Sequence, residues 1–263
     1  MVEIDVFAVR HTLDRLLPLL PPPPARILEA GCGRGALAAA LGALGYRLTG
    51  VEPDDEACAA ARARGVDVLQ ADIAEVPAEG GYDTVLFTRS MHHVDGLDRT
   101  VAHAVGLVAP SGVLVLEEFA RERADRVAAG FVYDSRGLLV DAGVLVLPER
   151  VEPFDPDEDP ADRWERERGV TAADPLHTGA AMLAALAHAG AVVEADVRTD
   201  TLWRMVVPHG STWRCGDAQA GAVLESVRRV ERRRIAEGTL PAVGMLVTAR
   251  PGPDQSGGVV AGH

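Results

Sequence analysis

Residues 27–35 read ILEAGCGRG, an apolar run that ends in an acid and continues into three glycines at alternate positions. Residues 36–41 read ALAAAL and consist of good helix formers. This pattern predicts a strand, a tight turn and a helix. Glycines let the backbone turn sharply and let a ligand come close, and the helix that follows offers free N–H groups and the positive end of its dipole. We therefore expect a ligand site at this turn, with Glu29 at the carboxyl end of the strand.

The glycine turn by itself is compatible with more than one interpretation. Gly31, Gly33 and Ala36 also fit the G-x-G-x-x-G/A pattern of dinucleotide-binding proteins. A carboxylate just before the glycines favours a ligand that carries an ammonium or a sulfonium over one that carries a pyrophosphate. A glycine turn without any ligand is the third interpretation.

Residues 29–35 resemble motif I, E/D-x-G-x-G-x-G, of the class I S-adenosylmethionine-dependent methyltransferases. The resemblance implies a Rossmann-like domain with S-adenosyl-L-methionine as cofactor. It also implies that Glu29, Gly31, Gly33 and Gly35 belong to the cofactor site, with Glu29 near the ammonium group.

An acid ends the second expected strand, residues 47–52. Glu52 follows Gly31 by about 20 residues, the spacing at which a carboxylate accepts hydrogen bonds from both ribose hydroxyls. This feature fits a methyltransferase and an NAD enzyme equally. The alternative is an acid that stabilises the start of the next helix, but Asp54 and Asp55 already serve that purpose.

A third acid, Asp72, follows a short expected strand over residues 66–71. In the resembled family this position accepts a hydrogen bond from the adenine amino group, and the next residue, here Ile73, packs nearby. From its chemistry alone, Asp72 could equally cap the turn over residues 72–75.

The fourth expected strand, residues 82–88, is almost continuously apolar, as in a buried parallel sheet. The segment that follows resembles one found after strand four in small-molecule methyltransferases, which implies that Thr88 and Arg89 contact the methionine part of the cofactor. His92 and His93 are candidate catalytic bases, since imidazole titrates near neutrality. Adjacent helical residues point about 100° apart, so we expect one histidine to pack and the other to face the cleft, without a shared metal.

The rest of the chain continues the alternation of strands and helices, with one interruption. We expect a helix within residues 1–24 that covers the cofactor site, as in the resembled family, and a fifth strand ending near residue 119. The segment 120–178 breaks the rhythm and is predicted to form a substrate cap. Later elements are expected at the positions that follow: a helix at 179–189, a strand at 191–199 continuing to 205, a helix at 217–238 with a solvated acid–base face, a strand at 241–249, and a disordered tail at 251–263.

The amino-acid composition limits which partners the protein can bind and which chemistry it can perform. The 263 residues carry a net charge of −13, which disfavours nucleic acid, and no apolar stretch is long enough to span a membrane. The 3 cysteines are widely spaced, so we expect neither disulfides nor a metal site, and a cytoplasmic location. The chain has no lysine, which excludes Schiff-base chemistry and a P-loop.

These inferences predict an α/β protein. Its Rossmann-like, seven-stranded, mostly parallel sheet has helices on both faces and a last strand that is antiparallel. Residues 25–119 and 179–250 form the sheet domain, and the cap is inserted after strand five. The function that the resemblance implies is methyl transfer from S-adenosyl-L-methionine to a small-molecule acceptor, with a homodimer as the predicted assembly. An NAD(P)-dependent oxidoreductase and a cofactor-binding protein without methyl transfer stay open as alternatives.

Overall fold

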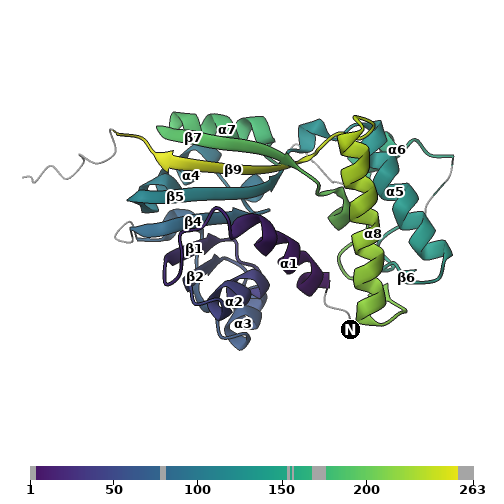
Figure 1. Ribbon diagram of the computed structural model, residues 1–263, viewed down its shortest axis with the longest axis horizontal. Helices are drawn as coiled ribbons and strands as arrows, with labels where there is room; N and C mark the ends of the chain where they lie inside the picture. Colours follow the sequence, from purple (N-terminus) through teal and green to yellow (C-terminus); the bar gives the residue numbers. More distant parts are fainter. Residues whose placement is uncertain (1–3, 78–80, 153–154, 156, 168–175, 254–263) are drawn as a thin grey trace, which may run out of the picture. The chain divides into compact units, whose positions relative to one another are not determined.

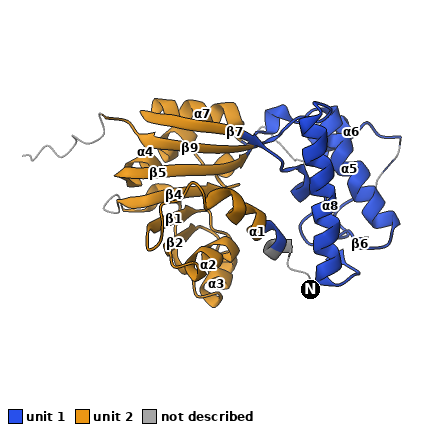
Figure 2. Ribbon diagram, viewed as in Figure 1, with its two compact units in different colours: residues 1–8, 119–176, 198–244 blue, residues 9–118, 177–197, 245–263 orange. Residues whose placement is uncertain are grey.

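The computed structural model describes the chain except for residues 1–3, 78–80, 153–154, 156, 168–175 and 254–263, among which lies most of the predicted tail. The described residues divide into two compact units (Figure 2). Unit 1 comprises residues 1–8, 119–176 and 198–244, and unit 2 comprises 9–118, 177–197 and 245–263. Each unit is described by itself below.

Unit 2 is built on a seven-stranded sheet (Figure 1). Its strands are β1 (Arg26–Ala30), β2 (Arg47–Glu52), β3 (Asp67–Gln70), β4 (Tyr82–Thr88), β5 (Val108–Phe119), β7 (Ala191–Thr199) and β9 (Gly244–Pro251). The helices that connect them are α2 (Ala36–Ala43), α3 (Asp55–Ala63), α4 (Leu97–Leu107) and α7 (Gly179–His188), with short 3-10 turns η1 (Ile73–Glu75) and η2 (Met91–His93). Helix α1 (Ile4–Leu16) begins in unit 1 and continues into unit 2.

The strand order is β3-β2-β1-β4-β5-β9-β7, and the pairs β3–β2, β2–β1, β1–β4 and β4–β5 are parallel. The order reverses between β1 and β4, so a crevice opens at their carboxyl ends, where such sheets bind ligands. In register, Ala30 lies opposite Phe87. The next residues, Gly31 and Thr88, therefore come side by side at the crevice.

The last strand of the chain, β9, is antiparallel to its neighbour β5. The N–H of Ala120, just after β5, donates to the carbonyl of Val243, just before β9, at 2.8 Å. At the opposite end, Arg250 Nη1 donates to the carbonyls of Ser111 and Gly112 at 2.9 and 3.0 Å. The end of one strand thus meets the start of the other, which confirms the predicted antiparallel strand.

Helices cover both faces of the sheet, so the central strands are buried on both sides (Figure 1). Four of the five residues of β1 are buried, and Ile27 belongs to a core with Leu37 and Leu41 of α2 and with Leu16 of α1. This two-sided burial is what the apolar runs of the sequence predict, and it fixes the strand ends that form the site.

Unit 1 is mainly helical. Its elements are η3 (Arg121–Arg123), α5 (Arg126–Asp141), α6 (Pro160–Glu167), η4 (Leu202–Met205), α8 (Asp217–Ala236) and an antiparallel pair of short strands, β6 (Leu145–Val146) and β8 (Thr212–Trp213). Its core is rich in aromatic side chains, including Phe131, Tyr133 and Trp164.

The two units differ from the predicted division of the chain. We assigned 179–250 to the sheet domain, but residues 198–244 join residues 119–176 in unit 1. The reason is packing: Leu202 and Val243 share a core with Phe131. The predicted cap over residues 120–178 is therefore only part of unit 1.

The strand predicted to continue to residue 205 ends at Thr199, and η4 follows. Glu231 of α8 explains the change, because its buried carboxylate accepts the N–H groups of Thr201, Leu202 and Trp203 at 2.7 to 2.8 Å. Three successive N–H groups cannot converge on one carboxylate in a strand, where they alternate in direction. Burial raises the pKa of Glu231 to about 7 even though these donors act in the opposite direction. Glu231 is thus not part of a solvated acid–base face.

Candidate functional site

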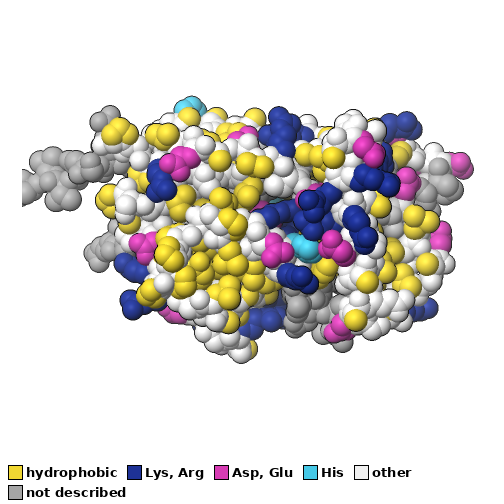
Figure 3. Space-filling model, viewed as in Figure 1, with side chains coloured by type: hydrophobic (Ala, Val, Ile, Leu, Met, Phe, Trp, Pro, Cys, Tyr) yellow, Lys and Arg dark blue, Asp and Glu magenta, His cyan; other side chains and the backbone are white. Residues whose placement is uncertain are grey.

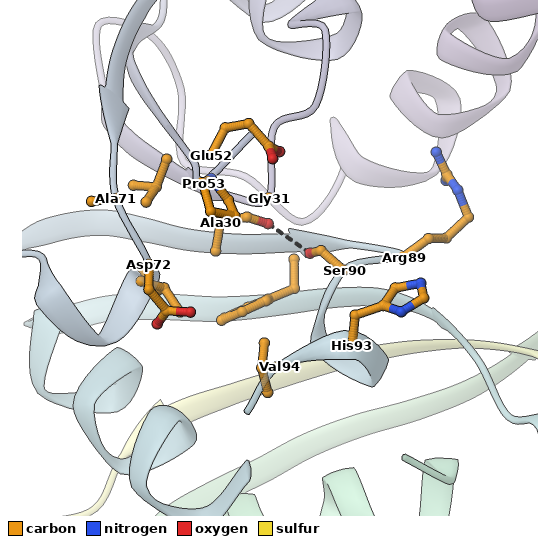
Figure 4. Close-up of a pocket in the computed structure, with 13 residues that line it drawn as sticks. Ala30, Gly31, Glu52, Pro53, Ala71, Asp72, Arg89, Ser90, His93 and Val94 are labelled. Carbon is orange, nitrogen blue, oxygen red and sulfur yellow. Dashed lines mark hydrogen bonds between the residues drawn. The ribbon is translucent and has the colours of Figure 1, made fainter. Parts of the chain in front are cut away.

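A pocket of about 290 Å³ lies in unit 2 at the carboxyl ends of β1, β2, β3 and β4 (Figure 4). The residues that line it are Ala30, Gly31, Val51, Glu52, Pro53, Ala71, Asp72, Ile73, Phe87, Arg89, Ser90, His93 and Val94. Six of the predicted site residues are among them: Gly31, Glu52, Asp72, Ile73, Arg89 and His93. In Figure 4 the acids Glu52 and Asp72 lie on one side, and Arg89 and His93 lie on the other.

The three glycines of the turn share a backbone conformation but differ in their surroundings. All have positive φ angles, 70° at Gly31, 53° at Gly33 and 75° at Gly35, which favour glycine. A Cβ on Gly31 would lie 2.5 Å from the Cβ of Ser90, and one on Gly35 would lie 2.8 Å from the Cβ of Ala61. Gly31 and Gly35 are thus needed for the packing of the chain itself, and of the three glycines Gly31 lines the pocket.

Glu52 holds the turn and lines the pocket at the same time. Its Oε2 accepts the N–H of Gly33 at 2.9 Å, and its Oε1 accepts the N–H of Asp54 at 3.0 Å. Each carboxylate oxygen has a second lone pair, so two hydroxyl donors can still be accepted. Asp54 caps α3 through the N–H of Ala57, as the sequence indicated.

Asp72 caps η1, the structural alternative that its sequence context allowed. Its Oδ1 accepts the N–H of Ala74 at 2.7 Å, while Glu75 Oε2 accepts the N–H of Asp72 at 3.1 Å. This capping box fixes the carboxyl group at the pocket wall. Capping occupies one oxygen, so a ligand donor has access to the other acceptor sites of the group.

Glu29 is almost completely buried and does not line the pocket, although Ala30 and Gly31 next to it do. Its Oε1 accepts a hydrogen bond from the Thr88 hydroxyl at 3.2 Å, and its buried Oε2 has no hydrogen-bond partner among the described residues. Burial raises the pKa of Glu29 to about 8, against the opposing effects of Thr88 and of the positive charge of Arg89. Oε2 is thus a buried acceptor that an ammonium group would satisfy.

Arg89 has a strained backbone at the pocket wall. Its φ of 58° is unusual for a residue with a side chain, and its N–H donates to the Glu117 carbonyl at 2.8 Å. Its Nη1 also donates to Glu117 Oε2 at 2.9 Å. The buried Glu117 carboxylate accepts further hydrogen bonds from Thr12 and Arg15 of α1, so α1 and the pocket arginine share one acid.

The two histidines differ in their surroundings: His92 packs inside the turn, and His93 lines the pocket. His92 Nδ1 lies 2.7 Å from Oε2 of the buried Glu118, whose Oε1 accepts the N–H groups of Ser90 and Met91. His92 is therefore held inside the turn and is not among the pocket residues, whereas His93 lines the pocket. The ring centroids are 4.1 Å apart. Of the two candidate bases, His93 is the one with access to the pocket.

Sequence reasoning assigned no role to Glu117 and Glu118. The available signal was two acids at the carboxyl end of an otherwise apolar strand, a position that faces the ligand crevice in a parallel sheet. His177 was also missed: its N–H donates to the His92 carbonyl at 2.9 Å, and its Nε2 lies 2.8 Å from the Val94 carbonyl. No local pattern predicts such a contact, because His177 is distant in sequence.

Among the described residues, no group of His, Cys, Asp and Glu side chains has an arrangement that could hold a metal ion. The helices of the described part of the chain are all too short or too polar to cross a membrane.

Acids at the tips of β2 and β3, beside a glycine turn at the point where the strand order reverses, define a Rossmann-like nucleoside-binding domain. The sequence profile of the methyltransferase domain family matches residues 5–167, more than half of the chain. The protein belongs to this family.

Curated relatives are similar over a limited region. A ubiquinone biosynthesis O-methyltransferase of Rickettsia felis is 29% identical over 103 residues, which is 37% of this chain and 42% of that protein. One of Aromatoleum aromaticum is 33% identical over 95 residues, 33% of this chain and 41% of that protein. The chain thus matches less than half the length of these relatives.

Solved structures resemble the whole chain. A SAM-dependent methyltransferase of Thermotoga maritima, described as a possible histamine N-methyltransferase, has a TM-score of 0.54 at 16% identity, covering 94% of this chain and 90% of that one. The magnesium protoporphyrin IX methyltransferase of Synechocystis, with bound SAH, has a TM-score of 0.53 at 14% identity, covering 95% and 85%. These findings confirm the predicted family and fold, and they support S-adenosyl-L-methionine as the cofactor.

Proposed function

We propose that this protein is an S-adenosyl-L-methionine-dependent methyltransferase that acts on a small-molecule acceptor. The observation that carries the proposal is one pocket with Glu52 and Asp72 at successive strand ends and Arg89 opposite them. A nucleoside needs acceptors for its hydroxyl and amino groups, whereas an amino-acid tail needs a cation for its carboxylate. The pocket separates these two kinds of group along its length.

In this proposal each charged residue predicted for the cofactor site has a distinct task. Glu52 accepts the two ribose hydroxyls with its remaining lone pairs, and Asp72 accepts the adenine amino group beside Ile73. Arg89 faces the carboxylate of the methionine part. Glu29 takes the ammonium group with Oε2, its buried oxygen without a partner.

When bound, the cofactor supplies a methyl group on a sulfonium, which is already reactive toward nucleophiles. The protein therefore mainly has to hold the acceptor in line and exclude water. Apolar side chains of the pocket, among them Phe87 and Val94, favour such exclusion. His93 lies at the same pocket and is suited to take a proton from the acceptor, whereas His92 is engaged with Glu118.

The small-molecule acceptor is supported by the curated relatives, which are named ubiquinone biosynthesis O-methyltransferases. On the face drawn in Figure 3, basic side chains gather near the centre with acidic side chains beside them. That nucleic acid is not the partner stays a prediction from the net charge of −13. The homodimer and the cytoplasmic location remain predictions from the sequence.

Calorimetric titration with S-adenosylhomocysteine and with NADH tests the cofactor. We expect S-adenosylhomocysteine to bind and NADH not to bind, and Glu52→Ala to weaken the binding at least tenfold, since it loses two hydrogen bonds to a charged acceptor. Glu56→Ala, at an exposed acid of α3, is the matched control and should bind normally. Tight NADH binding without S-adenosylhomocysteine binding would instead favour the oxidoreductase.

Single-turnover methyl transfer from labelled cofactor tests the base. We expect His93→Ala to lower the rate by about 100-fold or more, because general-base catalysis contributes about that much, and to remove the acidic limb of the pH–rate profile, where protonation of the base slows the reaction. His92→Ala should keep that limb, since His92 does not line the pocket. Full rates in both variants would exclude a histidine base and leave positioning as the whole mechanism, and turnover without label transfer would favour the binding-protein alternative.

A further inference from the structure

Unit 1 contains a cavity of about 830 Å³, which is within the size range of small-molecule sites. All the described residues that line it belong to unit 1. They come from residues 133–141 of α5, from the segment 143–151, from Arg163 of α6 and from Arg214, which follows β8.

The wall of this cavity combines an apolar floor with a charged side. Val140, Leu145, Val146, Leu147 and Val151 supply the apolar part. The described charged residues of the lining are three arginines and two acids, listed in full: Arg136, Arg163, Arg214, Asp141 and Glu149. Both acids are exposed, whereas Arg136 and Arg163 are buried.

The two buried arginines form a rigid wall. Arg163 and Arg136 both bond to Glu167, and their guanidinium groups lie 5.0 and 5.1 Å from the centroid of the Tyr133 ring. Arg136 also donates to the carbonyls of residues 205 and 206. Hydrogen bonds and cation–π contacts therefore hold these groups in place, and they supply positive potential without having to rearrange.

Arg214 differs from them. It is exposed, it lines the same cavity, and its guanidinium has neither an ion pair nor a hydrogen bond with any residue that the structure describes. Its backbone N–H donates to the Val144 carbonyl at 2.9 Å, which anchors the residue beside β6. A guanidinium with all its donors available, on an anchored backbone beside an apolar floor, is suited to bind an acid group.

We propose that the unit 1 cavity binds an amphipathic organic anion, a small molecule with an apolar body and one carboxylate, sulfonate or phosphate. The acid group pairs with Arg214, and the body lies on the apolar floor of Leu145, Val146 and Leu147. This inference does not depend on the proposed methyl transfer, because the site lies entirely in residues of unit 1.

Two fluorescent probes with the same aromatic body test the proposal in the full-length protein. 8-Anilinonaphthalene-1-sulfonate carries an acid group, and N-phenyl-1-naphthylamine is its neutral counterpart. Both are titrated with S-adenosylhomocysteine in excess, so that the unit 2 pocket does not contribute to the signal. We expect one sulfonate probe per chain, bound at least tenfold more tightly than the neutral probe, because a charge-assisted pair is worth about that factor.

Variants locate the binding. Arg214→Gln should weaken the sulfonate probe about tenfold and leave the neutral probe unchanged, and Leu147→Glu should weaken both. Arg232→Gln is the matched control, since Arg232 is an exposed arginine of α8 that does not line the cavity. Arg136 and Arg163 are left intact because both are buried and paired with Glu167, so their replacement would also disturb the core of unit 1.

Several results would overturn the proposal: equal affinity for the two probes, no sulfonate binding by protein with a native circular dichroism spectrum, or an Arg214→Gln variant that binds the sulfonate like the wild type. Photo-crosslinking of the bound sulfonate probe gives an independent measure, and labelled peptides should come from residues 137–151. Labelling confined to unit 2 would equally refute the site.

Discussion

Replacing Glu29 by glutamine tests the electrostatics beneath the glycine turn. Burial raises the pKa of this carboxyl from the ordinary 4.5 to about 8, so the folded protein retains a proton that the unfolded chain releases. The contribution of Glu29 to stability is therefore complete below pH 4.5 and is lost as the pH rises toward about 8. At 1.36 kcal/mol per pKa unit, the loss amounts to about 5 kcal/mol.

Glutamine has the same shape and does not titrate, so the Glu29→Gln variant lacks this loss. We expect the free energy of unfolding of the variant, relative to wild type, to rise by about 4 kcal/mol between about pH 5 and about pH 9. Guanidinium unfolding followed by circular dichroism measures it at both pH values. The difference removes the contributions of other titrating groups, and Glu56→Gln at an exposed acid is the control and should show no such rise.

The proton that the folded protein retains on Glu29 should also be released when the cofactor product binds. If the ammonium of S-adenosylhomocysteine meets Glu29, binding near neutral pH releases close to one proton, because the carboxyl must ionise. Calorimetry in two buffers of different ionisation enthalpy measures this number, and Glu29→Gln should bring it near zero. A variant whose unfolding free energy follows the wild type at every pH would show that Glu29 is already ionised in the folded protein.

The remaining predictions concern the close packing of the glycine turn and the hydrogen bonds of Glu231. Gly31→Ala places a Cβ 2.5 Å from that of Ser90 at a φ of 70°, so it should destabilise the protein by about 2 kcal/mol or more and abolish S-adenosylhomocysteine binding. Gly42→Ala in α2 places a Cβ with no described atom within 4 Å, so it should stabilise the folded protein against thermal unfolding by up to about 1 kcal/mol. Glu231→Ala leaves three N–H groups without their acceptor and should cost about 3 kcal/mol or more in urea unfolding; because its pKa is raised to about 7, the wild-type contribution should decline from about pH 4.5 to about pH 7.

The strand ends that form the site could be predicted from the sequence because they depend on local patterns. Apolar runs identify parallel strands buried on both faces, and the acid after each run marks its carboxyl end. Parallel strands bring those ends to one edge, so Glu52 and Asp72 had to share a crevice with Gly31. The spacing of the glycines required the turn itself, whatever the ligand.

The tertiary structure decided what depends on contacts between distant residues. Glu29, which the sequence assigned to the ammonium group of the ligand, is buried with its carboxyl group hydrogen-bonded to the Thr88 hydroxyl, and this burial depends on contacts that the local sequence does not show. The sequence also could not distinguish His92 from His93, since Glu118 at the end of β5 selects which ring is held inside.

The alternation of strands and helices, the glycine turn and the acids around it could all be predicted from the sequence, because each depends on residues within one short segment. That residues 198–244 leave the sheet to join 119–176, and that an arginine-lined cavity forms there, became evident in the folded chain. The physical reason is that side-chain packing between segments far apart in the chain has no local period, so it exists only once the chain has folded.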